Sequence, residues 1–303
     1  MTAIPLFRRL WRAQVGELVV ADSLAGDSGA LDITFKVKKT LGSSHAGTLD
    51  LTVFNLNEEH RRELATMPRR TTFVSLDAGY ESAGQASRLF TGDLRKAVVA
   101  KDGPTWTVKV TAGSGEHSRR SARVSRSFAP NTSLADVVRH LADAMGVGIG
   151  NAREAFVAAQ MQGGAQLYGG GSTLHGRAAE ELERICTACG LSYSVQDGVL
   201  QVIRLGGALD RTAILLSPGS GLVGSPEIVN RRTITVKALI QPGLVPGQRI
   251  VVESDVIGGV WRITEAEYSG STSAVDWYVT MTCHRPAPPL LGERVAGQRQ
   301  EIQ

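Results

Sequence analysis

Alternation between apolar and polar side chains organises the first third of the chain. Apolar residues occupy every second position from Leu31 to Val37, with polar ones between them, which predicts a half-buried strand over residues 31–39. Further strand-like runs occupy residues 15–20, 47–56, 73–80, 89–100 and 106–112. A short helix is predicted among them, with Asn57 as its N-cap and Pro68 marking its end. Short antiparallel strands with one small helix are typical of a barrel or sandwich.

The period changes to that of a helix in the middle of the chain. Ser133 precedes a stripe of apolar side chains three and four residues apart, and Gly146 follows it, which predicts a capped helix. A second helix is predicted over residues 174–189. Residues 152–162 form either a short helix or an ordered loop.

A hairpin is predicted directly after the second helix. Asp197 and Gly198 lie between two alternating runs, and this dipeptide is a strong signal for a two-residue hairpin turn. The Gly-rich residues 163–171 are expected to form an irregular loop. The helices and the hairpin therefore predict a small α+β insert.

Strand-like runs return after residue 208, with turns set by Pro and Gly. They occupy residues 214–216, 233–240, 249–254, 260–268 and 277–283. The last two runs echo the first block, because Trp261 lies 16 residues before Trp277, just as Phe90 lies 16 before Trp106. A true repeat and a chance match of two hairpins are equal alternatives at this point.

The predicted fold is mainly β with an α+β insert. It comprises two antiparallel β-barrels and a small helix–hairpin domain. The expected boundaries are 1–115 for the first barrel, 116–207 for the insert, 208–287 for the second barrel and 288–303 for a C-terminal tail.

Composition adds little to this interpretation. The chain has 303 residues, 42% hydrophobic and 20% charged, which is enough for two domains or three small ones. A net charge of +4 permits contact with nucleic acid without requiring it. An odd count of three cysteines argues against a disulfide framework. No signal peptide or membrane span is expected, which predicts a soluble protein made in a reducing cytoplasm.

Candidate catalytic motifs are present but incomplete. Gly-Asp-Ser-Gly at 26–29 resembles a serine protease motif, but too few residues precede it to supply the His and Asp, so a turn is favoured. Cys186 and Cys189 form a C-x-x-C at the end of a predicted helix, where the dipole opposes a thiolate, and a core position is favoured. The six histidines show no metal-ligand spacing. No catalytic, cofactor-binding or metal-binding residues are predicted, and no cofactor is expected.

A basic cluster is the strongest charged feature. Its members are Arg119, Arg120, Arg123 and Arg126. It could meet phosphate or an acidic protein surface, and without aromatic residues between the arginines a protein contact is favoured.

Several turn and packing motifs, in order, resemble the baseplate hub proteins of contractile bacteriophage tails and related injection systems. They are Leu89-Phe-Thr-Gly-Asp93, Asn131-Thr-Ser-Leu134, Gly176-Arg-Ala-Ala-Glu-Glu-Leu182, Gly190 to Gly198, Ser217-Pro-Gly219, Gly224-Ser-Pro226 and Leu244-Val-Pro-Gly247. The resemblance covers most of the chain.

The resemblance implies a structural protein, not an enzyme, located in the baseplate of the virion and assembled in the host cytoplasm. It implies a homotrimer with two tail-tube-like barrels per chain, whose pseudo-sixfold ring adapts a hexameric tail tube to a trimeric spike. The implied partners are the tail tube or tube-initiator protein and the central spike, with the tape measure protein and the baseplate wedge as further candidates. DNA is expected to pass through the lumen without specific binding, and no membrane contact is expected.

Two other functions are open on the sequence alone. The helix–hairpin unit at 174–203 could bind glycan, which would make the chain a peptidoglycan-binding or wall-degrading tail component. The basic cluster could instead mark a nucleic-acid-binding protein.

Overall fold

The computed structural model describes most of the chain, in the segments 8–24, 30–42, 47–81, 85–114, 121–161, 171–209, 212–241 and 243–286. The Gly-Asp-Ser-Gly motif at 26–29, Arg119, Arg120 and the predicted tail 288–303 lie outside these segments. The loop predicted at 163–171 lies almost wholly outside them as well.

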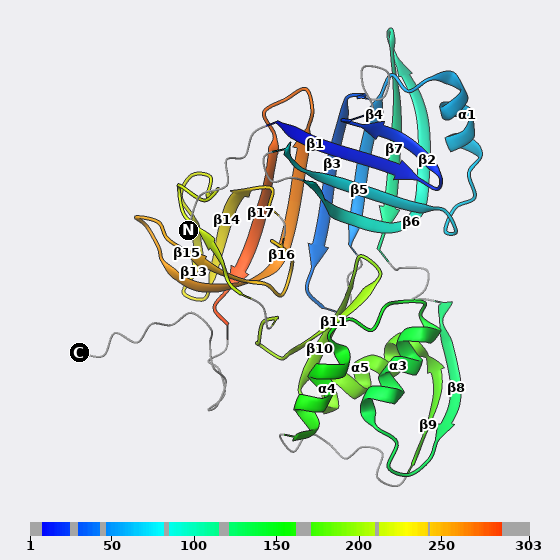
Figure 1. Ribbon diagram of the computed structural model, residues 1–303, viewed down its shortest axis with the longest axis vertical. Helices are drawn as coiled ribbons and strands as arrows, with labels where there is room; N and C mark the ends of the chain where they lie inside the picture. Colours follow the sequence, from blue (N-terminus) through cyan, green and yellow to red (C-terminus); the bar gives the residue numbers. More distant parts are fainter. Residues whose placement is uncertain are drawn as a thin grey trace.

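Thirteen strands form one connected sheet (Figure 1). Its first lobe contains β1 (Arg9–Val15), β2 (Leu18–Asp22), β3 (Ile33–Thr40), β4 (Thr48–Phe54), β5 (Phe73–Tyr80), β6 (Gln85–Asp102) and β7 (Thr105–Gly113). Its second lobe contains β12 (Ile214–Leu216), β13 (Glu227–Asn230), β14 (Thr233–Leu239), β15 (Arg249–Val252), β16 (Gly259–Ser271) and β17 (Trp277–His284). Hydrogen-bonded neighbours follow the order β13-β14-β17-β16-β3-β4-β7-β6-β5-β1-β2, and β15 and β12 extend from β16.

The apolar faces of these strands meet in one core. Buried side chains from both lobes belong to a single continuous cluster, with Phe90, Trp261 and Tyr268 among the largest. Burying an apolar side chain contributes about 1.5–3 kcal/mol, so this shared core is the main force that holds the lobes together. The mainly β prediction is confirmed, and closure of each lobe into its own barrel stays a prediction.

A smaller body with its own core lies between β7 and β12. Its elements are β8 (Arg123–Phe128), α3 (Leu134–Ala144), α4 (Ala152–Met161), β9 (Ser172–Arg177), α5 (Ala178–Ala188), β10 (Leu191–Gln196) and β11 (Val199–Arg204). Figure 1 shows this insert below the sheet, with the β10–β11 hairpin reaching toward the lower end of β3.

Local sequence signals place the starts of α1 and α3 and the hairpin turn correctly. Asn57 accepts a hydrogen bond from the His60 amide at 2.8 Å and caps α1 (Glu58–Thr66). Ser133 accepts one from the Asp136 amide at 3.1 Å and caps α3. Asp197 and Gly198 have positive φ values of 52° and 77°, as a two-residue hairpin turn requires. Residues 152–161 form a helix, which decides between the two alternatives.

The helix predicted over 174–189 is partly wrong. Its first residues belong to β9, which pairs antiparallel with β8, and α5 begins only at Ala178. Gly176 has a φ of 124°, which no helix accommodates, so the chain stays extended up to this residue. Strand β8 was not predicted either, because Arg123 and Arg126 were interpreted as part of a charge cluster.

The antiparallel prediction needs one correction. β12 pairs with β15 in parallel, with Ile214 opposite Ile250. The insert separates β12 from the first lobe, so β12 is free to enter the second lobe in either direction. Every other named pair in the described sheet is antiparallel.

The two lobes contain the same structural unit. In the first lobe β3, β4, β5, β6 and β7 follow one another, and in the second lobe β13, β14, β15, β16 and β17 do. In the first unit, the hairpin β6–β7 pairs with β4 through β7. In the second unit, the hairpin β16–β17 pairs with β14 through β17, and β4 and β14 are each the second strand of their unit. Helix α1 occupies the position of the loop between β14 and β15.

The registers of the two units also agree. Ala112 and Cys283 each lie six residues after a Trp, and they face Leu49 and Ile234 respectively on the adjacent strand. The pairing with the opposite neighbour slips by one residue next to Ala112 and Cys283 in both units. A shared bulge at a shared position is not expected of two unrelated hairpins. The registers therefore support a repeated unit in which Trp106 and Trp277 are equivalent. The 16-residue spacing itself is not shared, because Leu94 corresponds to Ile263 and Trp261 therefore corresponds to Gly92, not to Phe90.

The units are joined edge to edge. β3 pairs antiparallel with β16 from Thr34 opposite Ser271 to Thr40 opposite Glu265. Gly270 lies opposite Phe35, whose ring packs edge-on against Trp277 with 5.3 Å between centroids. The core and the backbone pairing thus cross the junction together.

We expect Gly270→Ala to destabilise the protein by about 1–3 kcal/mol, the usual cost of overpacking a core. A Cβ at this position would lie 2.3 Å from two atoms of the Phe35 ring, so the ring or the strand has to move. Urea unfolding followed by circular dichroism measures the loss. Ser269→Ala, one residue away on the opposite face, is the control and should change the free energy of unfolding by less than about 0.5 kcal/mol.

Candidate functional site: the junctions of the sheet

The outer face of the junction between the lobes carries a row of ion pairs. The Nζ atom of Lys36 lies 2.6 Å from a Glu267 carboxylate oxygen, and that of Lys38 lies 3.4 Å from Glu267 and 3.7 Å from Glu265. Exposed pairs of this kind contribute about 0.2–1 kcal/mol each. Because opposite charges face each other in only one register, the row also opposes slippage of β3 along β16.

These contacts change the ionisation of the paired groups. The hydrogen bond from Lys36 to Glu267, together with the carboxylate charge, raises the pKa of Lys36. Burial alone would raise the pKa of Glu267, but hydrogen bonds and charges from Lys36 and Lys38 outweigh it and lower that pKa. Both groups are therefore charged at neutral pH.

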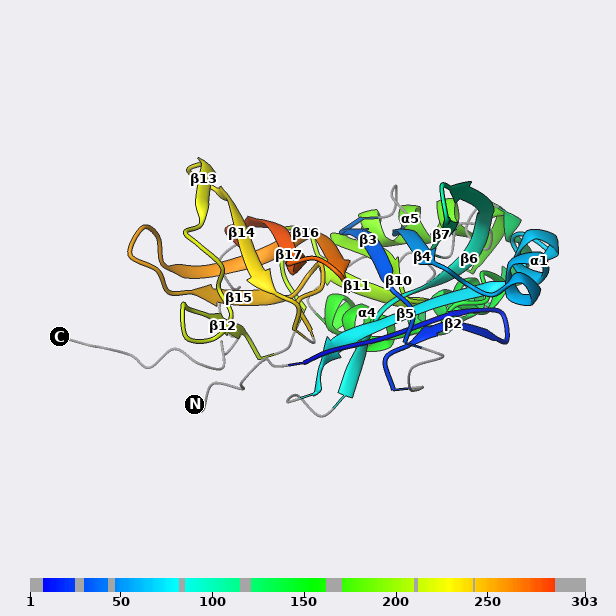
Figure 2. The same cartoon turned by 90° about the horizontal axis from the view of Figure 1, so that it is seen from above.

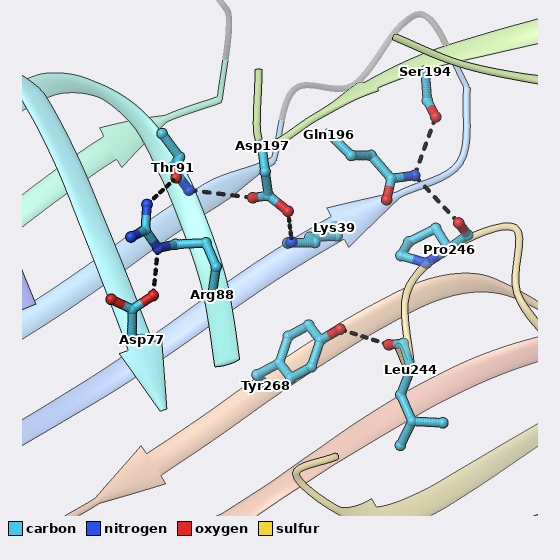
Figure 3. Close-up of polar contacts among 10 residues, drawn as sticks. All are labelled: Lys39, Asp77, Arg88, Thr91, Ser194, Gln196, Asp197, Leu244, Pro246 and Tyr268. Atoms are coloured by element: carbon cyan, nitrogen blue, oxygen red, sulfur yellow. Dashed lines mark hydrogen bonds and ion pairs between the residues drawn. The ribbon is translucent and has the colours of Figure 1, made fainter. Parts of the chain in front are cut away.

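A second junction fixes the insert to the sheet (Figure 3). Asp197, at the tip of the β10–β11 hairpin, accepts from the Nζ of Lys39 at 2.5 Å and from the Thr91 amide at 3.2 Å. Only 4% of the Lys39 side chain is exposed, against 27% for Asp197. A buried ammonium needs a counter-charge, so one carboxylate connects β3, β6 and the insert.

A loop of the second lobe completes this junction. Gln196 donates to the Pro246 carbonyl at 3.3 Å, and the Leu209 amide donates to the Gly247 carbonyl at 2.8 Å. The hydroxyl of the buried Tyr268 donates to the Leu244 carbonyl at 2.5 Å, which holds the loop against the core. Burial raises the pKa of Tyr268, so this hydroxyl stays protonated as a donor. Figure 3 shows these contacts side by side.

A third contact fastens the first lobe to the end of the second. Arg9, at the start of β1, donates to the carbonyl of Ser271 at 2.7 Å and to that of Val275 at 3.0 Å. Its guanidinium lies 5.3 Å from the centre of a ring of Trp277. The Arg9 side chain thus binds the backbone of the turn between β16 and β17.

The C-x-x-C cysteines lie at the end of α5, as the sequence predicts. Burial raises the pKa of the Cys186 thiol to about 12 and also raises that of Cys189. Both are protonated at neutral pH and are poor nucleophiles and metal ligands. Within the described residues no three His, Cys, Asp or Glu side chains group as a metal site would require.

The described half of the basic cluster lies on the exposed side of β8. Arg126 contacts His140 at 3.1 Å and lies 5.5 Å from the centre of the Phe128 ring, while Arg123 is exposed. These are local contacts on the insert surface, and the predicted role in protein contact stays a prediction.

A small crevice accompanies the second junction. This crevice beside Lys39 and Asp197 is lined also by Phe90 and Ser114, with space for about one water molecule. A search of the described helices finds none with the length and hydropathy of a membrane span.

Comparison with known families identifies this architecture. Residues 29–283 match the family model described as baseplate hub gp41. The chain belongs to this family. It is therefore a bacteriophage tail protein of the baseplate, which places it in the virion. Curated proteins give no significant sequence match.

Solved structures of tail proteins share the fold of this hub-family chain. It is similar to the 43 kDa tail protein of prophage MuSo2 from Shewanella oneidensis, with a TM-score of 0.57 and 10% identity over 91% of this chain and 98% of the other. A Neisseria meningitidis tail protein gives 0.53 and 12%, covering 92% and 97%. An Escherichia coli component of the type VI secretion system gives 0.50 and 12%, covering 91% and 77%. The resemblance inferred from the turn motifs is confirmed.

The residues that carry the junctions of the hub were not predicted. Lys39 and Asp197 are 158 residues apart, and Arg9 reaches a turn more than 260 residues away. One signal was available: Lys39 occupies an inward position of the alternating pattern, where an apolar residue is expected. An inward lysine requires a partner, but the pattern does not say which residue supplies it.

We expect Asp197→Asn to destabilise the hub by about 2 kcal/mol, because the ammonium of Lys39 stays buried without its counter-charge; wholly buried pairs cost about 3–5 kcal/mol. Asn tolerates the positive φ of this turn, so the backbone is kept. Chemical denaturation gives the free energy of unfolding. The double variant Lys39→Met/Asp197→Asn is the control and should recover most of the loss, whereas equal losses in single and double variants would show that the charges are not coupled.

The stabilisation from Glu267 should depend on pH. A carboxylate whose pKa is lowered by folding stabilises the fold above its ordinary value of 4.5, and this contribution is lost as the pH falls through the lowered pKa. The difference in free energy of unfolding between wild type and Glu267→Gln should be up to about 1 kcal/mol near neutral pH and shrink below pH 4.5. Urea titrations at several pH values test this, and a difference that grows on acidification would contradict it.

Proposed function

We propose that this chain is the structural hub of the baseplate, acting as a homotrimer that adapts a sixfold tail tube to a threefold spike. The observation that supports this most is the repeated unit, with the same strand order and register in both lobes. Three chains would supply six such units. A threefold ring made in this way offers six similar edges to a sixfold partner and three to a threefold one.

The edge-to-edge junction supports the same proposal. β3 and β16 place the two units side by side in one sheet, so both units face the same side of the chain. A pseudo-sixfold ring needs neighbouring units in this relation, because units that faced opposite ways could not follow one circle. The insert is attached at one end of the sheet (Figure 1), and Lys36, Lys38 and Asp50 on the outer face are exposed. Seen from above, β14, β17, β16, β3 and β4 follow one another across both lobes (Figure 2).

The polar face of the sheet fits a channel wall past which DNA moves without being held. Lys36, Asp50, Lys109 and Glu267 lie on consecutive or neighbouring strands of this face, among threonines. Positive and negative charges alternate, so the face offers no continuous row of cations to bind phosphates. We propose that the chain has no catalytic activity. We propose that its partners are the tail tube at one end and the spike at the other, with the tape measure protein and the wedge as further candidates.

The wall-binding alternative has less support. The tip of the 174–203 helix–hairpin unit is occupied by the contact with Lys39 and the Thr91 amide, so this tip serves attachment within the chain. A glycan site would have to lie elsewhere on the insert.

We expect the purified full-length protein to have a native mass of about three times 32.2 kDa, by native mass spectrometry or light scattering. The proposed ring requires three copies, and the same number should be counted in the tail particle by electron microscopy. A single copy, both in solution and at the baseplate, would contradict the trimeric hub.

A further inference from the structure

Strand β6 has one edge that no described strand occupies. Its first half, up to Asp93, pairs with β5, and its second half, Asp93 to Asp102, pairs with β7 on the other side. From Lys96 onward, the side that β5 has left carries no partner within the described part of the chain. Val98 on this segment is 37% exposed.

The equivalent edge in the second lobe is occupied. β16 pairs with β15 up to Arg262, and the rest of the same side, from Glu265 to Ser271, pairs with β3. Position by position, the second half of β16 corresponds to that of β6, because Gly270 and Lys101 both face the Trp of their hairpin. On this side β16 is therefore paired with β3, whereas the equivalent segment of β6 pairs with none of the described strands.

Strand β13 is the counterpart of β3 and lacks a second neighbour. Each is the first strand of its unit and forms a hairpin with the next one. β3 has β16 on its other side, whereas β13 pairs only with β14 among the described strands. Ile228 and Val229 in β13 are 53% and 57% exposed. An apolar strand open at one edge is a template for pairing with another chain.

We propose that β13 of one copy pairs antiparallel with the free edge of β6 in a second copy, as β3 pairs with β16 inside the chain. The inference rests on the proposed trimer and names the contact that forms it. Each copy offers one β13 and one free β6 edge, so the contact is head-to-tail and closes into a ring when the last copy meets the first.

The repeat fixes the register of this contact on the β13 side. Glu227 faces Thr235 on β14, and Lys36 faces Asp50 on β4. Thr235 and Asp50 are equivalent, because each faces the residue five positions after the Trp of its own hairpin. Glu227 therefore corresponds to Lys36, and by the same reasoning Ile228 corresponds to Val37.

The β6 side follows from the junction inside the chain. Lys36 faces Ser269, and Val37 faces Tyr268. Ser269 and Ala100 are equivalent, since each faces the residue directly after its Trp, and Tyr268 is likewise equivalent to Val99. The proposed contact thus places Glu227 opposite Ala100 and Ile228 opposite Val99.

Cysteine cross-linking of the full-length protein tests this register. Ala100 and Glu227 are both exposed in the single chain, so Ala100→Cys/Glu227→Cys should fold normally. Cβ atoms directly opposite each other lie about 4.5–5.5 Å apart, close enough for a disulfide after a small shift. Mild oxidation should then give covalent species of up to three chains on a non-reducing gel. Of the three native cysteines, Cys186 and Cys283 are buried and Cys189 is partly exposed, and the variants that carry only Ala100→Cys or only Glu227→Cys control for all three.

The matched control moves one cysteine by one residue. Lys101 is also exposed, but its side chain points to the other face of the strand, so Lys101→Cys/Glu227→Cys should give at least tenfold less cross-linked product. As a second measurement, Ile228→Lys should lower the native mass to that of one chain, while Val256→Lys, in the turn between β15 and β16, should not.

The outcomes separate this inference from the proposed function. A trimer by native mass that neither cross-links through Ala100 and Glu227 nor responds to Ile228→Lys would overturn the β13–β6 contact and leave the trimeric hub standing. A wild-type monomer in solution and in the particle would overturn both. Equal cross-linking of the matched and shifted pairs would show collision without register and also reject the contact.

Discussion

The antiparallel pairing of β3 with β16 is the constraint on which the rest of the structure depends. It connects strands more than 220 residues apart in sequence, and it turns two similar units into one sheet with one core. The ordering entropy of such a distant contact is large, so its backbone hydrogen bonds need the burial of Phe35 and Trp277 behind them and the ion pairs of Lys36 and Lys38 in front. The backbone hydrogen bonds, the packing of the core and the ion pairs all favour the same register of β3 against β16.

The proposed function depends on strand edges and not on a reactive group. The Cys186 thiol is buried and protonated, and Lys39 is paired with Asp197. The insert is joined through its hairpin tip, to the one place where β3, β6 and the loop at 243–247 meet. The insert therefore adds a second body at the end of the sheet without interrupting the strand order within either unit.

Sequence predicted what local interactions decide. The caps at Asn57 and Ser133 and the turn at Asp197 depend on residues within a few positions, and most strands show alternation because one face is buried. β13 was missed for the opposite reason: all four of its side chains are exposed, so no alternation exists to be detected. The ion pair of Lys39 could not be assigned, since nothing in a single sequence relates residues 158 positions apart.

The differences between the two equivalent edges are as informative as their likeness. Where β16 presents Glu265 and Glu267 to the lysines of β3, β6 presents Lys96 and Val98, and β13 brings Glu227, Ile228 and Val229. A junction within one chain is held together by the connection itself, so exposed ion pairs suffice to set its register. A junction between chains must also repay the entropy of association, for which apolar area is better suited. Val98 of β6 takes the position of Glu267, and Ile228 of β13 keeps the apolar character of Val37 at the equivalent position. The replacement of an ion-pairing carboxylate by valine is what this difference requires.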